Sequence, residues 1–174
     1  MMTDRYVVRR AEEADYREPG ALAPDARGYT RWCAVGFEDG SAHTDFGMSR
    51  LEPGGIIPTH IHSFEESFHL VEGEVILVTP EATVHLVAGD YGGIPLGVPH
   101  SWHNTGDEVA VWSDIYSPPP RPQHDYDTYR VADIAPGEPV KVDPRDPRTR
   151  SFGAITTEQM NPGKQSQELL AQSA

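Results

Sequence analysis

Two short segments concentrate side chains that can bind a metal ion. The first holds His60, His62 and Glu66, and the second holds His100. Successive side chains of a β-strand point to opposite faces, so an extended backbone places both imidazoles and the carboxylate of the first segment on one face. Such a facial array suits a borderline divalent cation, and a further ligand from a neighbouring strand would tighten binding. His100 is the candidate for that ligand.

The same alternation places large aromatic side chains beside this array. Phe64 and Phe68 share the predicted face of the first segment, and Trp102 shares the face of the histidine in the second. These rings either fill the interior of the sheet or line a substrate pocket, and aromatic walls favour an apolar or aromatic ligand. Arg50, on the strand that enters the first segment, either clamps a substrate carboxylate or pairs with Glu52. The candidate substrate-pocket residues are therefore Arg50, Phe64, Phe68 and Trp102.

Short strands must position these residues. Between about residues 44 and 116 the apolar residues occur in short runs bounded by Gly, Pro and Asp, as in EVILVTP and ATVHLVAGD. Glu72-Gly73 and Gly89-Asp90 lie between such runs, where a hairpin needs residues that tolerate a positive φ. The pattern predicts an antiparallel meander or a Greek-key barrel.

Both segments resemble the two sequence motifs of the cupin superfamily. The resemblance covers about residues 44–116 and implies an all-β fold, a cupin jelly-roll β-barrel of the small bacterial type. It implies one divalent metal ion in the barrel mouth, and commonly a homodimer in which N-terminal strands pack on the partner. The implied metal ligands are His60, His62, Glu66 and His100. The matching positions are Gly54, His60, His62, Glu66 and Gly73 for the first motif, and Gly89, Pro95, Gly97, His100 and Asn104 for the second.

The segments on either side of the predicted barrel are less informative. We expect residues 1–43 to add strands to the barrel or to a dimer. Residues 117–174 read as a Pro-rich linker and a partly helical tail, with a short helix from Gln165 to Gln172. This tail resembles the linker that follows the first barrel in some two-barrel cupins, so the chain is interpreted as a half that recovers its neighbour by dimerising.

Charge and composition exclude several classes of partner. The 14 Lys and Arg residues face 27 Asp and Glu residues, a net charge of −13, so nucleic acid and anionic membrane surfaces are disfavoured. The single cysteine, Cys33, cannot form an intrachain disulfide. The N-terminal residues contain no apolar stretch typical of a signal peptide or a membrane span. We therefore expect a cytoplasmic protein with a small-molecule substrate.

An open metal site favours catalysis. Four protein ligands on an octahedral ion leave two positions for substrate and for water or dioxygen. The ligand set is compatible with Fe, Mn, Ni, Cu or Zn and does not choose among them. The leading hypothesis, drawn from the resemblance, is a dioxygenase-type oxidoreductase, similar to quercetinase, that acts on a small aromatic or enolisable substrate. In this hypothesis Glu66 is both a ligand and a catalytic proton acceptor.

Two alternatives stay open. The same ion would serve a redox-neutral lyase, isomerase or hydrolase by stabilising an enolate, and such an enzyme would turn over without oxygen. A non-catalytic cupin that binds a metal or a small ligand is the other alternative, because a shared barrel does not fix the reaction.

Overall fold

A computed structural model of the chain describes residues 6–22, 24–143 and 145–149. The backbone divides into two compact units, Met1–Lys141 and Val142–Ala174, and every residue discussed below as part of the site belongs to the first. In the second unit the described residues include a short 3₁₀ helix, η4 (Pro147–Thr149). The helix predicted at Gln165–Gln172 lies outside the described residues. Among the described helices, none is long and apolar enough to cross a membrane.

The first unit is built almost entirely from strands, which confirms the predicted all-β class. Three short 3₁₀ helices connect or flank them, η1 (Ala11–Glu13), η2 (Phe37–Asp39) and η3 (Pro122–Asp127). The strands are β1 (Arg27–Val35), β2 (Asp45–His62), β3 (Glu65–Glu72), β4 (Glu74–Val78), β5 (Thr83–Val87), β6 (Tyr91–Ile94), β7 (His100–His103), β8 (Ala110–Ser117), β9 (Thr128–Arg130) and β10 (Val140–Lys141).

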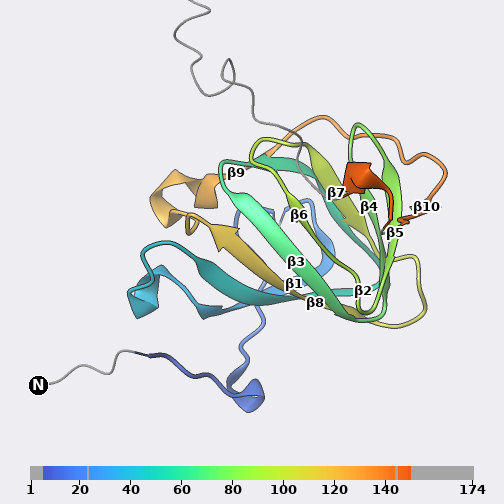
Figure 1. Cartoon of the computed structure of the whole chain (residues 1–174). Helices are drawn as coiled ribbons and strands as arrows, with labels where there is room; N and C mark the ends of the chain where they lie inside the picture. Colours follow the sequence, from blue (N-terminus) through green and yellow to red (C-terminus); the bar gives the residue numbers. More distant parts are fainter. Residues whose placement is uncertain (1–5, 23, 144, 150–174) are drawn as a thin grey trace, which may run out of the picture. The chain divides into compact units, whose positions relative to one another are not determined.

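These strands form one curled sheet around the long strand β2 (Figure 1). The hydrogen-bonded order is β10-β5-β4-β7-β2-β8-β3-β6, and β1 and β9 also pair with β2. The first half of β2 pairs with β1 and β8, whereas its second half pairs with β7 and β9. Because β2 changes partners halfway along, it carries residues from the body of the sheet to the rim where the histidines lie.

A glycine turn inside β2 makes this change of partners possible. Gly54 has a φ of +70°, a backbone conformation that glycine adopts at little cost. Asn104 fixes the turn from the neighbouring segment, because its side-chain amide donates to the carbonyl oxygens of Leu51 and Glu108. These contacts explain the glycine and the asparagine of the two motifs as structural residues.

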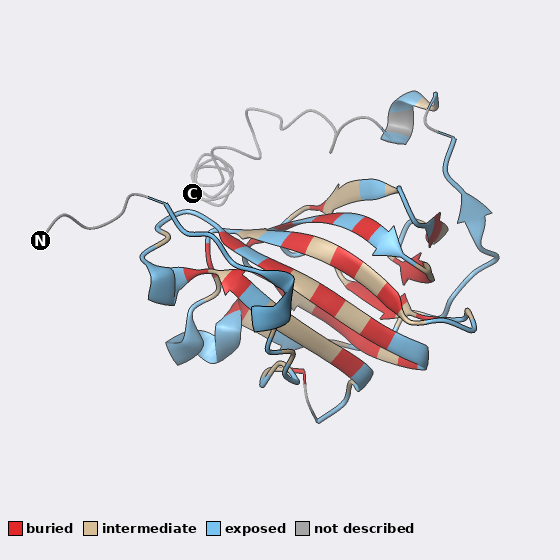
Figure 2. Cartoon of the chain, turned by 90° about the horizontal axis from the view of Figure 1, so that it is seen from below, coloured by how far each residue is buried: buried red, intermediate tan, exposed pale blue. Residues whose placement is uncertain are grey.

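Buried side chains alternate with exposed ones along the strands (Figure 2). The inward positions form one apolar core around stacked indoles, Trp102 and Trp112, whose ring centroids are 5.4 Å apart. Phe68 meets Trp102 edge to face at 5.0 Å. This core packs against β2 and β7, the strands that carry the histidines, and so holds their backbone in place.

The flanking segments contribute to the same sheet. β1, from the N-terminal flank, pairs with β2 from Arg27 to Val35. The sequence predicts no strand after residue 117, yet β9 pairs with the His60–His62 end of β2 and β10 pairs with β5. These two strands are short and largely exposed, so they lack the alternation by which strands are recognised.

Candidate metal centre

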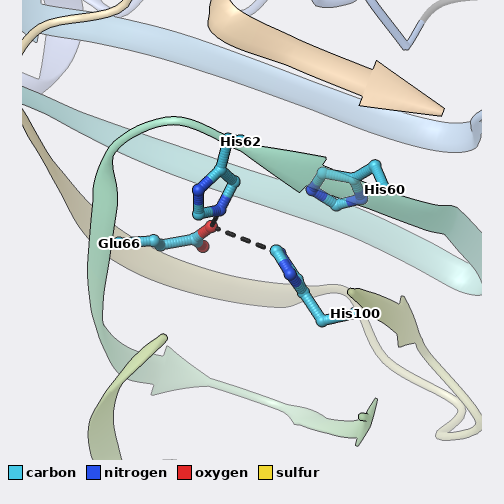
Figure 3. A group of neighbouring side chains, drawn as sticks. All are labelled: His60, His62, Glu66 and His100. Atoms are coloured by element: carbon cyan, nitrogen blue, oxygen red, sulfur yellow. Dashed lines mark hydrogen bonds and ion pairs between the residues drawn. The ribbon is translucent and has the colours of Figure 1, made fainter. Parts of the chain in front are cut away.

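Three strands bring four potential ligands together at the rim. His60 and His62 lie at the end of β2, Glu66 is the second residue of β3 and His100 is the first residue of β7 (Figure 3). One ligand atom from each of them lies within 4.8 Å of all the others, and all four residues are buried. The structure therefore brings together the four side chains that the motif spacing selected, although the first and the last of them are 40 residues apart in the sequence.

The backbone between the first two ligands and Glu66 is not the single strand that the sequence predicted. β2 ends at His62 and β3 begins at Glu65, with a bend at Ser63 and Phe64 between them. The connection is two residues long, and an even number of residues preserves the alternation of faces. Phe64 is buried and Ser63 is exposed, so the predicted parity holds although the strand is interrupted.

Each histidine is oriented by its own backbone. The Nδ1 atoms lie 2.9 Å from the carbonyl oxygen of Pro58 for His60, 2.7 Å from that of Phe64 for His62, and 2.9 Å from that of Val98 for His100. A carbonyl oxygen can only accept, so Nδ1 carries the proton and donates it in all three rings. The Nε2 atoms are thereby left to face the cluster, which is the arrangement that metal-binding histidines show.

The carboxylate of Glu66 completes the cluster. Its Oε2 atom lies 3.1 Å from Nε2 of His62 and 3.6 Å from Nε2 of His100. Burial alone would raise the pKa of Glu66, but its interactions with the neighbouring imidazoles of His100 and His62 outweigh burial and hold that pKa far below its usual range. Burial and the neighbouring His100 lower the pKa of His60 to about 3, so its imidazole is neutral at physiological pH.

An unsatisfied atom indicates what this cluster lacks. Nε2 of His100 is fully buried and has no hydrogen-bond partner among the described residues. Leaving a buried polar atom unpaired costs about 1–3 kcal/mol, a penalty that coordination to a cation would remove. Three imidazoles and one carboxylate, all shielded from water, fit a divalent metal ion of the cupin type. The donor set does not identify the metal.

The cluster opens onto a cavity of about 870 Å³, whose lining includes His60, His62 and Glu66. Of the predicted pocket residues, Phe64 and Trp102 line this cavity. Phe68 is not among its lining residues, because its ring packs in the core against Trp102.

Arg50 does not belong to the cavity, and this corrects its assignment as a pocket residue. Ser49 and Leu51 take the inward positions of β2, so Arg50 points to the opposite face of the sheet. There its guanidinium lies 5.2 Å from the ring centroid of Tyr16. Among the described residues, no hydrogen bond or ion pair joins Arg50 to Glu52, so pairing with Glu52 does not explain where Arg50 lies.

The opposite wall of the cavity was not assigned from the sequence, because the parity of its strands could not be fixed. Tyr29 and Arg31 reach it from β1, and Trp112 and Tyr116 reach it from β8. The signal was present as alternation, since Tyr29 and Arg31 are two residues apart, as are Trp112, Asp114 and Tyr116. This alternation did not show which residues face the cavity, because either face of an alternating strand can point inward. The register between β1, β2 and β8 decides which face does so.

Arg31 is the centre of a buried polar network on that wall. Its Nε donates to Oδ1 of Asp114 at 2.7 Å, and its Nη2 donates to Oδ1 of Asp45 at 2.5 Å. Ser49 donates to Oδ2 of Asp114 at 2.5 Å. Burial raises the pKa of Asp114, although Arg31 and Ser49 oppose this shift. The guanidinium carbon lies 4.2 Å from the ring centroid of Tyr116, whose pKa is raised well above its usual value mainly by burial.

Comparison with known proteins agrees with this architecture. The polyketide cyclase RemF from Streptomyces resistomycificus matches with a TM-score of 0.57 and 21% identity, over 79% of this chain and 89% of that chain. A protein described as a predicted oxalate decarboxylase, from Thermotoga maritima, matches with a TM-score of 0.57 and 21% identity, over 64% and 98% of the two chains.

A third solved structure, described as a sugar phosphate isomerase of the cupin superfamily from Silicibacter pomeroyi, matches with a TM-score of 0.54 and 24% identity, over 64% of this chain and 75% of that chain. At these identities the likeness concerns the fold. No curated protein sequence matches the chain. The model of the cupin domain family matches residues 47–116, which span β2 to β8 and contain all four clustered side chains. The chain therefore carries a cupin domain at residues 47–116.

Proposed function

We propose that this cupin is a divalent-metal-dependent enzyme that acts on a small aromatic or enolisable molecule, with dioxygenase-type oxidation as its reaction. The observation that carries the proposal is a cluster of four buried donors, three of which line a cavity of about 870 Å³ with aromatic walls. A site that only stabilised the fold would be closed on all sides, whereas this one faces a space of the size that ligand pockets have.

The metal ligands in this proposal are His60, His62, Glu66 and His100. When bound, the ion supplies Lewis acidity at the inner end of the cavity and, for a redox-active metal, the capacity for dioxygen chemistry. The three imidazoles present Nε2 because their Nδ1 protons are held by backbone carbonyls. Glu66 is the proposed proton acceptor, since it is the carboxylate of the cluster and lines the cavity.

The aromatic lining prepares the cavity for such a substrate. Phe64 and Trp102 are almost fully buried, at 3% and 2% exposed, yet both border the cavity. Their rings exclude water from the inner end and offer flat surfaces for stacking. A planar substrate that carries oxygen atoms at one edge would fit between these walls with that edge toward the histidines.

Metal analysis and oxygen uptake test the proposal together. The purified protein is expected to contain about one divalent ion per chain. It should consume dioxygen with members of a panel of catechols, enediols and flavonols. His62→Ala should lose both metal and oxygen uptake, whereas His85→Ala, which removes a partly exposed imidazole paired with Glu74, should keep both. Metal-loaded protein that consumes no oxygen with any member of the panel would contradict the oxidation.

A redox-neutral reaction is the second candidate, and the same cluster beside the cavity supports it. A divalent ion held by the cluster would stabilise negative charge that develops on a substrate oxygen, which a lyase, isomerase or hydrolase requires. The names of the similar structures include a cyclase, a decarboxylase and an isomerase. Product formation under strict anaerobiosis would select this candidate. Metal and ligand binding without turnover in either atmosphere would leave a non-catalytic binding protein.

A homodimer is also part of the proposal. The outer face of the sheet exposes Phe46 and Ile115, which are cross-strand neighbours on β2 and β8, and Val71 of β3 is exposed as well. Exposed apolar side chains on a sheet are typical of a surface that meets a partner. Light scattering after size exclusion should give twice the chain mass of 19.2 kDa. The cytoplasmic location stays a prediction.

A further inference from the structure

The hydrogen-bonding capacity of Arg31 is only partly used. Nε and Nη2 donate to Asp114 and Asp45, and Nη1 has no acceptor among the described residues. The side chain is 11% exposed and lines the cavity. A guanidinium carries five N–H donors in a rigid plane, so the Nη1 donors remain available to a ligand inside the cavity.

Close packing around Arg31 and its partners holds these side chains in one orientation. An added Cβ at Gly47 would collide with the guanidinium and would lie 2.8 Å from the carbonyl oxygen of Trp32. An added Cβ at Gly36 would lie 2.7 Å from Sγ of Cys33 and 2.9 Å from Oδ2 of Asp45. Gly47 in β2 and Gly36 directly after β1 thus leave room for the buried side chains at positions where any other residue would displace them.

The charges around Arg31 do not favour an anion. Asp114 is fully buried and Asp45 is 8% exposed, so two carboxylates compensate one guanidinium in a region with little water. The outer part of the cavity lining is acidic too, with Glu18 and Glu38, whereas its Arg17 is paired with Asp15 and its Asp39 is paired with Arg9. An anionic group that entered would meet uncompensated negative charge and lose its hydration.

Aromatic rings connect Arg31 to the proposed metal centre. The ring of Tyr116 lies beneath the guanidinium, and its centroid is 4.6 Å from that of Phe64, which stacks on His62 at 4.1 Å. A flat ligand that reaches from the histidines toward Arg31 would therefore pass along aromatic surface.

We infer that the cavity selects an uncharged, flat aromatic ligand with oxygen at both ends, and that Arg31 determines this specificity by donating from Nη1 to a neutral carbonyl or hydroxyl oxygen at the end remote from the histidines. Asp45 and Asp114 keep Arg31 from acting as a receptor for carboxylates or phosphates. The inference deepens the proposed function, on which it rests for the place of the metal-binding end of the ligand. It sets this cavity apart from one that takes oxalate or a sugar phosphate.

Two catechols that differ only at the remote end provide the test. Dihydroxyacetophenone carries a neutral ketone where dihydroxybenzoate carries a carboxylate, and at mildly acidic pH only the benzoate is charged. Their dissociation constants can be measured by quenching of tryptophan fluorescence, because Trp102 and Trp112 line the cavity. Wild-type protein, both metal-free and loaded with redox-inert zinc, should bind the ketone about tenfold more tightly than the acid.

Variants assign this preference to the network. Arg31→Gln should weaken the ketone about tenfold while leaving unsubstituted catechol unchanged. Asp45→Asn should reduce the ketone preference to less than about threefold by strengthening binding of the acid. Asp107→Asn removes the same charge from an exposed loop outside the cavity and should leave the preference unchanged. Near-ultraviolet circular dichroism reports whether each variant is folded, and Glu38→Gln at the cavity entrance replaces Asp45→Asn if the latter is not.

Three results would overturn the inference: equal or tighter binding of the acid by wild-type protein, unchanged ketone affinity in Arg31→Gln, or an equal effect of Asp107→Asn and Asp45→Asn. The proposed function fails in a different way. Absence of zinc binding or of turnover would contradict the enzyme, whereas the ratio of the two dissociation constants in metal-free protein tests Arg31 alone.

Discussion

The rings of His62 and Phe64 lie face to face, with centroids 4.1 Å apart and planes inclined by only 6°. The same two residues share a hydrogen bond, from Nδ1 of His62 to the carbonyl oxygen of Phe64 at 2.7 Å. Phe64 therefore fixes the imidazole twice, once through its side chain and once through its backbone. Because a substitution removes only the first contact, the contribution of the ring can be measured separately.

Phe64→Ala should lower the zinc affinity of the protein by about tenfold, as loss of a residue that orients a metal-binding histidine typically does. The backbone hydrogen bond is retained, so binding should weaken and not disappear. Competition with a chromophoric chelator measures the dissociation constant. Tyr91→Ala is the control, because the Tyr91 ring is exposed and does not line the cavity. Equal zinc affinity in Phe64→Ala and wild type would show that stacking does not orient His62.

Metal addition should stabilise the fold through the four clustered side chains. A ligand at one hundred times its dissociation constant that binds only the native state adds about 2.7 kcal/mol to the free energy of unfolding. The melting temperature of metal-free protein should therefore rise by several degrees on addition of zinc. In Glu66→Gln and His100→Ala this rise should be largely lost, whereas in His85→Ala it should persist. A rise of equal size in Glu66→Gln would place the bound zinc elsewhere.

Motif spacing predicted the metal cluster better than strand continuity did. The alternation of buried and exposed residues from His60 to Phe68 survives the bend at Ser63 and Phe64, because the bend contains an even number of residues. The bend itself carries no glycine or proline, the residues that usually signal a break, so the sequence favoured one continuous strand. The alternation of faces was therefore sufficient to place His60, His62 and Glu66 on one face, and the exact ends of the strands were not needed.

The residues that surround Arg31 could not be placed together from the sequence alone. Its partners Asp45 and Asp114 come from β2 and β8, and all three meet only because the register of β1, β2 and β8 aligns them. No short-range pattern encodes that register, since it depends on pairing between residues as far as 83 positions apart. Arg50 was misassigned for the same reason. Its neighbours Ser49 and Leu51 face inward, which only the pairing with β8 reveals.

Gly47→Ala should destabilise the protein by about 1–3 kcal/mol, the usual effect of inserting a methyl group into a packed interior. The added Cβ would collide with the Arg31 guanidinium and lie 2.8 Å from the carbonyl oxygen of Trp32, and neither can retreat easily. Urea denaturation measures the change in the free energy of unfolding. Gly137→Ala is the control, because Gly137 is exposed and an added Cβ there comes no closer than 3.5 Å to Oγ1 of Thr83. Similar stabilities for both variants would mean that the network tolerates displacement.

The ion pair between Arg121 and Asp127 should make stability depend on acid. Asp127 accepts hydrogen bonds from the side chain and the backbone N–H of Arg121, and these lower its pKa from 3.8 to about 2. The folded carboxyl thus binds its proton at lower pH than the unfolded one. The unfolded state binds more protons between about pH 4 and pH 2, so this contribution is complete above that window and is lost as the pH falls through it.

The Arg121 side chain is more than half exposed, so solvent screening should limit the effect to about 0.5–1 kcal/mol. Urea denaturation at a series of pH values should show a shallower loss of stability below about pH 4 in Asp127→Asn than in wild type. Asp125→Asn is the matched control in the same 3₁₀ helix, η3, because Asp125 is exposed. Since β9 follows η3 directly and pairs with His60 to His62, Asp127→Asn should also weaken zinc binding slightly at neutral pH. If Asp127→Asn and wild type lose stability equally as the pH falls below about 4, the acid sensitivity arises from other carboxylates.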